Sequence, residues 1–349
     1  MRVLFLTEAA AHIGGGHLIR CLTLAGELAR GGADVRFAVN KDAPRFAPAL
    51  ERAGFAFTTV RALSDAAEIA ARQGGIDTVV CDSYKFDAER EHSLRTIAAK
   101  IVVIDDLANR PHNCDLLIDA TFGRVALDYR DLVSPETVIL AGARYALLRP
   151  DFTALRDESL ARKAAGGGVK RLLVSLGLTD IGGITARVVA ALLEAKLKAQ
   201  IDVVIGPRVQ SRAVLEAMAA RDSRVELHID PPNIARLMTN ADIAIGAGGT
   251  TSWERCCLGL PTVLVVLADN QRLIGEKLGR AGAVRPIAGV TDAHLVEVTH
   301  TIIELSNDQN ARGKMIRAAA TIIDGRSAGH ATEAIYALMK QDTPADVRE

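Results

Sequence analysis

Short, nearly continuous apolar runs alternate with stretches of helical period throughout the first half of the chain. Each run is rich in Val, Ile, Leu or Phe, and a polar or glycine-containing segment follows it. This alternation is typical of βα units whose strands form a parallel sheet buried on both faces. The predicted strands are 3–7, 35–39, 55–60, 77–82, 101–106, 116–120 and 137–141, and the predicted helices are 17–30, 43–53, 64–73 and 86–98.

The pattern starts again after a polar, charged segment that ends in glycines 166–168. This segment is the best linker candidate, so we expect Rossmann-like domains at 1–150 and 169–325, with a C-terminal helix at 326–345 packing back on the first. Such α/β domains would face each other across a cleft and bind ligands at the carboxyl ends of their strands. In the second domain the predicted strands are 172–176, 201–206, 224–228, 241–247 and 262–267, and the predicted helices are 183–196, 210–220, 251–258, 270–281, 292–305, 308–322 and 328–340.

Composition narrows the possible partners. Lys plus Arg equals Asp plus Glu at 42 each in the 349 residues, so no long-range field favours nucleic acid, and any phosphate site must be local. No stretch approaches the roughly 20 apolar residues of a membrane span, and the first apolar run is too short for a signal peptide. We therefore expect a cytoplasmic protein without membrane insertion. The five cysteines indicate reduced, packed thiols, and none has the spacing of a zinc site.

The segment IGAGGTTSWERCCLGLP joins a predicted strand to a predicted helix in the second half. Its glycines let the backbone approach a ligand, and the helix start offers free N–H groups to a phosphate. It lacks the Lys of a P-loop and the spacing of a dinucleotide fingerprint. The alternative is an ordinary glycine-rich turn capped by Thr. Glu254, within the first helical turn, is either an acceptor for a ribose diol or a solvated carboxylate that complements the helix dipole.

A second glycine-rich loop follows the first strand in AHIGGGHLIRCLTLAGEL. His17 stands where this loop enters a helix, and a helix N-terminus disfavours the imidazolium ion. His17 could therefore remain neutral and act as a general base, although capping or support of another residue is an open alternative. His12, inside the loop, is a possible substrate contact.

Polar residues also follow two other first-half strands, at the same expected edge of the sheet. Asp82, Ser83 and Tyr84 end one strand, and Tyr84 could hydrogen-bond a base or sugar or could simply be half-buried packing. Asp105 and Asp106 end the next strand. Adjacent side chains diverge, so we favour turn capping over a metal or acid–base role for this pair.

Taken together, these segments resemble the UDP-sugar hydrolases of pseudaminic acid synthesis, which release UDP from UDP-2,4-diacetamido-2,4,6-trideoxy-β-L-altropyranose. The resemblance runs over most of the chain and rests on IGGGHLIRCLTLAGEL, VVCDSYKFD, VVIDDLANRPHNCDLLIDAT, RYALLRPDF and IGAGGTTSWERCCLGLPTVLVVLADNQ. It implies the GT-B fold, no metal or other cofactor, and attack of water on the anomeric carbon with inversion and departure of UDP. Through that pathway it also implies a link to flagellin glycosylation.

The resemblance also implies roles for particular residues. His17 would activate the water with help from Tyr84. The remaining residues would bind the UDP-sugar, which is the expected small-molecule partner: Gly15, Gly16, Arg20, Gly248, Gly249, Thr250, Thr251, Glu254 and Asn270. Donors at the start of the second-half helix would stabilise the charge that grows on departing UDP.

Three segments depart from the family pattern. The first loop has Glu8 and alanines where an Asp-Gly pair is usual, and DGRSAGHA at 324–331 lacks the usual Arg after its glycines. Leu178 replaces a glycine in SLGLTDIGG, where a Cβ could prevent positive φ and reshape the loop around a different sugar.

Two other functions remain open beside the hydrolase. A GT-B glycosyltransferase using a UDP-amino sugar, or a non-catalytic sugar-nucleotide-binding protein, would have a similar nucleotide half. A transferase for lipid acceptors should carry a basic and apolar membrane patch in its first half, and the sequence has no such run. The oligomeric state is not indicated.

Overall fold

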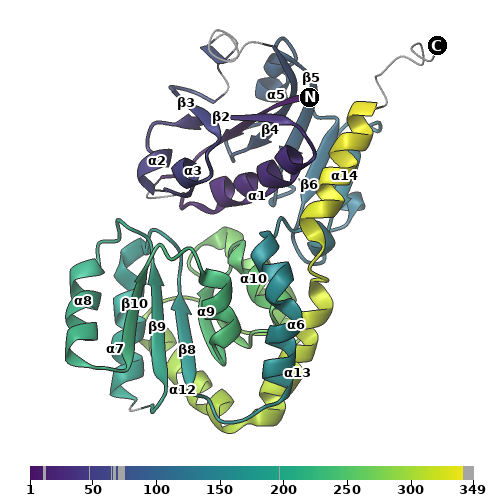
Figure 1. The fold of residues 1–349 in the computed structure, drawn as a ribbon. Helices are drawn as coiled ribbons and strands as arrows, with labels where there is room; N and C mark the ends of the chain where they lie inside the picture. The colour runs from purple at the N-terminus through teal and green to yellow at the C-terminus, as the bar shows by residue number, and fades with distance from the viewer. Residues whose placement is uncertain are drawn as a thin grey trace. The chain divides into compact units, whose positions relative to one another are not determined.

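The computed structural model describes residues 1–10, 13–46, 48–63, 65, 68–69, 75–195 and 197–340. The chain divides into two compact units (Figure 1). The first unit is Met1–Leu147 together with the chain from Arg326 onward, and the second is Leu148–Gly325. None of the described helices has the length and apolar character that a bilayer span requires.

The first unit is built on a seven-stranded parallel sheet in the order β3-β2-β1-β4-β5-β6-β7. Chain order reverses between β1 and β4, where Thr7 pairs with Asp82, so the loops after these two strands leave from the same edge. Its elements are β1 (Arg2–Thr7), α1 (Gly16–Arg30), β2 (Asp34–Asn40), α2 (Ala43–Phe46), α3 (Ala49–Arg52), β3 (Ala56–Val60), β4 (Ile76–Asp82), α5 (Ala88–Leu94), β5 (Ala98–Ile104), β6 (Leu116–Asp119), η1 (Ala126–Tyr129), β7 (Val138–Ala141), η2 (Ala143–Tyr145) and α14 (Ser327–Lys340).

Burial on both faces explains the continuous apolar runs. Successive side chains of a strand point to opposite faces, and in β1 Val3 and Phe5 join one core cluster while Leu4 and Leu6 join the other. The first cluster also contains residues of α1 and α14, which pack against each other. The Tyr336 hydroxyl of α14 donates to the Leu28 carbonyl of α1 at 2.7 Å.

The second unit has a six-stranded parallel sheet in the order β10-β9-β8-β11-β12-β13. Its core cluster draws on several of these strands and on the helices that cover them. Its elements are α6 (Pro150–Ala164), β8 (Arg171–Ser175), η3 (Ile181–Gly183), α7 (Ile184–Glu194), β9 (Gln200–Ile205), α8 (Arg212–Arg221), β10 (Val225–Ile229), α9 (Ile234–Asn240), β11 (Ile243–Ala247), α10 (Thr251–Cys257), β12 (Thr262–Val265), η4 (Asp269–Gln271), α11 (Arg272–Arg280), β13 (Val284–Ile287), α12 (Asp292–Asn307) and α13 (Gln309–Ile322).

Two local expectations need correction, one strand was missed, and one predicted helix is not tested. The expected linker is mostly helix α6 of the second unit, whose buried Ser159 and Lys163 hid its helical period. The helix expected at 43–53 is two short helices, α2 and α3, because Pro48 cannot continue a helix from the preceding turn. Strand β13 was missed because it contains Pro286, which only an edge strand tolerates. The helix expected at 64–73 lies largely outside the described residues.

The packing of α14 on the first unit predicts a measurable stability cost. Ile335 is fully buried in the cluster shared with α1. Replacing Ile335 by Ala should lower the free energy of unfolding by about 2 to 5 kcal/mol, because it removes buried methyl groups and leaves a cavity. Urea denaturation followed by circular dichroism measures the change. Val296→Ala, at a side chain that is 70% exposed, is the control and should change it by less than about 0.5 kcal/mol.

Candidate functional site

The carboxyl ends of β1 and β4 bring together the polar residues of the first unit. Asp82 is the last residue of β4 and has no exposed surface. Arg20 of α1 binds it with two hydrogen bonds, Nε to Oδ2 at 2.7 Å and Nη2 to Oδ1 at 2.6 Å. The third nitrogen, Nη1, donates to Oδ2 of Asp106 at 2.9 Å. One buried guanidinium thus joins the ends of β4 and β5 to helix α1.

This geometry suggests another role for Arg20 than the expected binding of substrate. All three of its guanidinium nitrogens already bind carboxylates, and its side chain is only 10% exposed. The arrangement supports a role in holding Asp82 and Asp106 rather than direct binding of substrate. Asp106 therefore does not cap a turn, whereas Asp105 does so as expected, by accepting from the amides of Leu107 and Ala108.

His17 lies in the first turn of α1, three residues before Arg20 and on the same face of the helix. Its Nδ1 is buried without a hydrogen-bond partner among the described residues and lies 3.9 Å from Oδ1 of Asp82. Gly15, not His17, occupies the cap position of α1, and Gly16 is the first helical residue. The alternative of a capping histidine therefore does not apply.

The surroundings of His17 favour its neutral form. Burial lowers its pKa below the usual value, Asp82 opposes this shift, and Arg20 reinforces it. The Tyr84 ring stands edge-on to the imidazole with ring centroids 4.7 Å apart, while Tyr84 itself is 38% exposed. A neutral imidazole beside a buried carboxylate can accept a proton from water.

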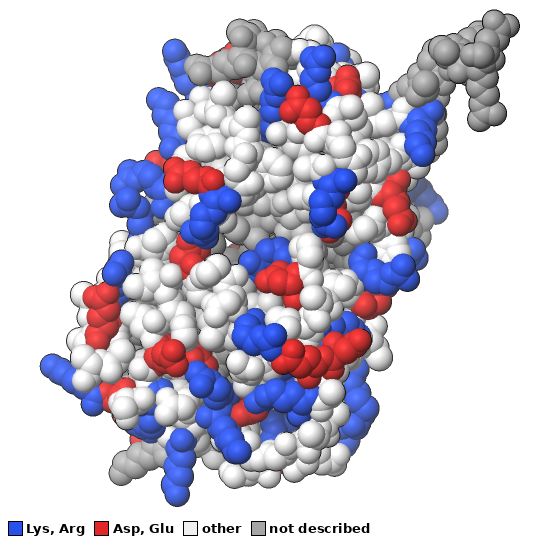
Figure 2. Space-filling model, viewed as in Figure 1, with Lys and Arg blue, Asp and Glu red and all other residues white. Residues whose placement is uncertain are grey.

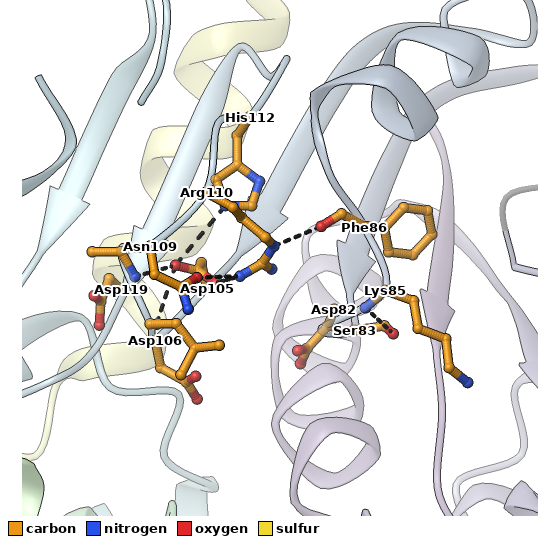
Figure 3. Close-up of polar contacts among 12 residues, drawn as sticks. Asp82, Ser83, Lys85, Phe86, Asp105, Asp106, Asn109, Arg110, His112 and Asp119 are labelled. Carbon is orange, nitrogen blue, oxygen red and sulfur yellow. Dashed lines mark hydrogen bonds and ion pairs between the residues drawn. The ribbon is translucent and has the colours of Figure 1, made fainter. Parts of the chain in front are cut away.

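Glu8, which departs from the family pattern, is buried next to this group. Its carboxylate accepts from the Ser83 hydroxyl and pairs with Lys85, whose Nζ lies 2.6 Å from Oε2. Ser83 also accepts from the Lys85 amide (Figure 3). In the sequence, Glu8 could be recognised only as a departure from the family pattern. Its partner Lys85 could have been found only as a basic residue two positions after Ser83. His12, in the same loop, lies outside the described residues.

A second polar network, not expected from the sequence, stands beside β5 and β6. The buried hydroxyl of Tyr129 lies 2.8 Å from both Asp105 and Asp119. Arg124 binds Asp119, and Arg110 bridges Asp105 and the Phe86 carbonyl, as Figure 3 shows for Arg110. Burial alone would raise the pKa of Asp105, but Arg110 and the turn amides hold it below its usual value. The positive charges of Arg110 and Arg124 offset the negative charges of Asp105 and Asp119. We therefore interpret this network as one that stabilises the neighbouring loops.

In the second unit, the glycine-rich segment joins β11 to α10 as expected. The unexpected residue is Arg255, whose fully buried guanidinium donates to the Ala247 carbonyl at 2.7 Å and to Thr251 Oγ1 at 3.0 Å. Burial lowers the pKa of Arg255 to about 10. A Cβ at Gly246 would lie 2.4 Å from this guanidinium, so that glycine makes room for Arg255 and not for a ligand.

The remaining glycines have different surroundings. The Gly248 amide donates to Oε1 of Gln271 at 3.2 Å, and a Cβ there would crowd Gln271. A Cβ at Gly249 would meet no atom within 4 Å, so its backbone borders open space. Thr250 is the cap residue of α10 but its side chain makes no capping hydrogen bond. Asn270 is exposed, and its neighbour Gln271 accepts from the amides of Gly248 and Leu267.

Glu254 is not the solvated carboxylate of the alternative interpretation. It is 8% exposed and pairs with Arg149, whose Nη2 lies 3.4 Å from Oε1. Burial raises the pKa of Glu254, and Arg149 opposes the shift. Leu178 also proves compatible with its loop, since the left-handed positions there are Gly177, Asp180 and glycines 182–183.

One group of potential metal ligands occurs among the described residues, on β9 and β10. Ligand atoms of Asp202, Glu226 and His228 lie within 4.8 Å of one another. Arg171 binds Asp202 at 2.6 Å and Glu226 at 3.1 Å, and His228 Nε2 lies 2.8 Å from Asp202. The carboxylates of Asp202 and Glu226 are thus already paired with Arg171, and Asp202 is also paired with His228.

No protein-family model matches the chain. It is 24% identical to a Campylobacter jejuni protein named UDP-2,4-diacetamido-2,4,6-trideoxy-beta-L-altropyranose hydrolase, over 81% of this chain and 97% of that protein. It is 22% identical to the Bacillus subtilis spore coat polysaccharide biosynthesis protein SpsG, over 76% and 78%. An uncharacterized Methanocaldococcus jannaschii protein, MJ1062, is 24% identical over 96% of this chain and 69% of that protein.

Several solved structures share the fold. The UDP co-structure of Staphylococcus aureus MnaA has a TM-score of 0.66 and 14% identity, covering 99% of this chain and 100% of that one. The spinosyn rhamnosyltransferase SpnG with thymidine diphosphate has a TM-score of 0.64 and 16% identity, covering 97% and 100%. Acinetobacter baumannii MurG has a TM-score of 0.62 and 15% identity, covering 96% and 99%. The predicted GT-B fold of two parallel-sheet α/β domains is confirmed, and the chain is a distant relative of the hydrolase and SpsG.

The environment of His17 predicts its titration. Its pKa should lie below 6.5 because the imidazolium would be buried with only partial compensation from Asp82. Nitrogen-detected NMR over the pH range in which the protein stays folded measures this pKa. The signal that disappears in a His17→Gln variant is the one that belongs to His17. A pKa above 6.5 would contradict the neutral imidazole on which the base role depends.

Proposed function

We propose that the protein hydrolyses a UDP-sugar, releasing UDP and the free sugar by attack of water on the anomeric carbon with inversion. The proposed substrate is a UDP-2,4-diacetamido-2,4,6-trideoxyhexose, as named for the Campylobacter jejuni relative, within nonulosonic (pseudaminic) acid synthesis. The observation that carries the proposal is the buried imidazole of His17, whose pKa burial lowers, beside the carboxylate of Asp82. A histidine that only contacted the sugar would not need burial beside a carboxylate.

His17 is the proposed general base. The carboxylate of Asp82, which Arg20 holds in place, would attract the Nδ1 proton of His17 and leave Nε2 as the acceptor. Their 3.9 Å separation exceeds a hydrogen bond, and such catalytic contacts commonly tighten when substrate binds. Water gives its proton to Nε2 as its oxygen bonds to the anomeric carbon. As this bond forms, the bond from that carbon to the β-phosphate oxygen breaks, and its electron pair leaves with UDP.

The second unit is proposed to bind the nucleotide. The first amides of a helix have no acceptor in the preceding turn, so that of Thr251, with those of Gly249 and Thr250 just before the helix, would bind the pyrophosphate. Open space beside Gly249 supports this assignment. Glu254 would accept from the ribose hydroxyls, with Arg149 holding its carboxylate in place. Asn270 remains a proposed sugar or phosphate contact, and Tyr84 would assist His17.

Acceptor-free turnover tests the proposal. The purified protein should release UDP from UDP-2,4-diacetamido-2,4,6-trideoxy-β-L-altropyranose without any acceptor, because water is the proposed nucleophile. Phosphorus NMR follows the UDP, and early proton spectra report the inverted anomeric configuration. Turnover only after an acceptor is added would indicate a glycosyltransferase, and UDP-sugar binding without turnover in either case would indicate a binding protein.

A His17→Ala variant separates catalysis from binding. Its kcat should fall by about 100- to 10,000-fold, the usual effect of losing a general base. Its affinity for UDP, measured by calorimetry, should stay unchanged because the proposed nucleotide site lies in the other unit. His300→Ala is the matched control, since that side chain is 70% exposed on α12. An unchanged rate in His17→Ala would remove this residue from the mechanism.

A further inference from the structure

A pocket of about 720 Å³ lies at the amino-terminal edge of the second sheet. Residues that directly precede strands line it: Lys170 before β8, Asp242 before β11 and Pro261 before β12. The loop of glycines 166–168 and the first turns of α13 complete the wall. In a parallel sheet this edge is opposite the carboxyl ends, where the loop from β11 to α10 emerges. The pocket is therefore separate from the proposed nucleotide site.

The pocket concentrates positive charge in a chain whose formal net charge is zero. Its charged lining residues are Arg162, Lys163, Lys170, Arg312 and Arg317 against the single carboxylate of Asp242, which gives five positive charges minus one, or +4. Figure 2 shows Lys and Arg side chains gathered toward the lower end of the second unit. A concave surface of one sign raises the local concentration of small ions of the other sign.

Two of these cations are buried without a carboxylate partner among the described residues. Lys163 donates to Ser159 Oγ at 2.6 Å and to the Thr239 carbonyl at 3.0 Å, both neutral groups. Arg312 donates to backbone carbonyls, including that of Gly167 at 2.6 Å. Burial lowers the pKa of Lys163 to about 7, and nearby Arg162 adds to the effect. Both side chains are therefore held in place by neutral acceptors, and neither forms an ion pair with a described carboxylate.

Free donors stand beside these fixed charges. Lys170 and Arg317 are exposed, and neither forms an ion pair with any residue that the structure describes. The amides of Gly167 and Gly168 are also exposed and donate to no described residue. Gly167 has φ of +121°, a conformation that only glycine adopts readily, and a Cβ there would meet nothing within 4 Å. Two exposed cations and two backbone amides thus border an open space.

We propose that this pocket binds a small phosphorylated anion of nucleotide size. Lys170, Arg317 and the amides of Gly167 and Gly168 would contact the phosphate oxygens. Lys163 and Arg312 would stabilise the bound charge without moving. Phosphate is favoured because several cations and amides can share its oxygens, and because the volume exceeds that of a single inorganic ion.

Calorimetry with inorganic tripolyphosphate tests this site. In the presence of saturating UDP, wild-type protein should still bind tripolyphosphate at one site, and affinity should fall as salt is raised. The double variant Lys170→Ala/Arg317→Ala should bind about 10- to 100-fold more weakly, because two charge-assisted contacts are lost. Both side chains are exposed, so this variant should fold, and circular dichroism checks it.

A charge-matched control removes two exposed cations elsewhere in the same unit, Lys198→Ala/Arg221→Ala. It should bind tripolyphosphate as the wild type does, which separates a local site from a loss of net charge. Wild-type affinity in the Lys170→Ala/Arg317→Ala variant, or an equal loss in the control, would overturn the proposal. So would complete competition by UDP. The comparison of the two double variants shows whether the pocket binds tripolyphosphate even if the protein does not bind UDP. Its outcome is therefore independent of the proposed hydrolase activity.

Discussion

The buried carboxylate of Asp82 is the constraint on which the first site depends. It ends a central strand with no exposed surface, and Arg20 compensates it through two hydrogen bonds. Removing Arg20 would leave the carboxylate of Asp82 as an uncompensated buried charge, at a cost of about 3 to 5 kcal/mol. The pair therefore fixes how α1 is rotated about its axis. Because His17 lies three residues before Arg20, the same pair also brings the imidazole to the end of β4.

The two units use one local design for different purposes. In each, a glycine-rich loop joins a strand to a helix, and an arginine of that helix is anchored by residues at the end of a strand. In the first unit Arg20 binds carboxylates, and the result is a neutral histidine next to a buried charge. In the second, Arg255 binds a backbone carbonyl and Thr251, and the result is a rigid helix start. The first arrangement suits proton transfer, and the second suits binding of a nucleotide phosphate.

Much of the fold could be predicted from the sequence because parallel strands buried on both faces leave continuous apolar runs. The prediction of secondary structure failed where a buried element does not form a continuous apolar run. Helix α6 buries Ser159 and Lys163, and strand β13 contains a proline, so neither has the usual hydrophobic signature. The rule that parallel strands end at one edge also placed His17, Asp82 and Tyr84 near one another.

Side-chain partners could not be predicted in the same way. Arg20 and Asp82 are 62 residues apart, and their contact depends on the packing of α1 against the sheet. Arg255 resembles an ordinary polar helix residue in the sequence, yet it is fully buried. Glu8 could be recognised as unusual, but its contacts with Ser83 and Lys85 required the geometry of two loops. Sequence patterns thus indicated which loops carry the candidate residues, whereas the charge balance around those residues needed the structure.

The central claim is that water activated in the first unit attacks the sugar carbon and not the phosphate. Turnover in oxygen-18-labelled water, followed by phosphorus NMR of the released UDP, tests it most directly. The account predicts UDP whose β-phosphate contains only unlabelled oxygen, because the bond between carbon and oxygen breaks. Labelled oxygen on the β-phosphate would mean attack on phosphorus and would contradict the account.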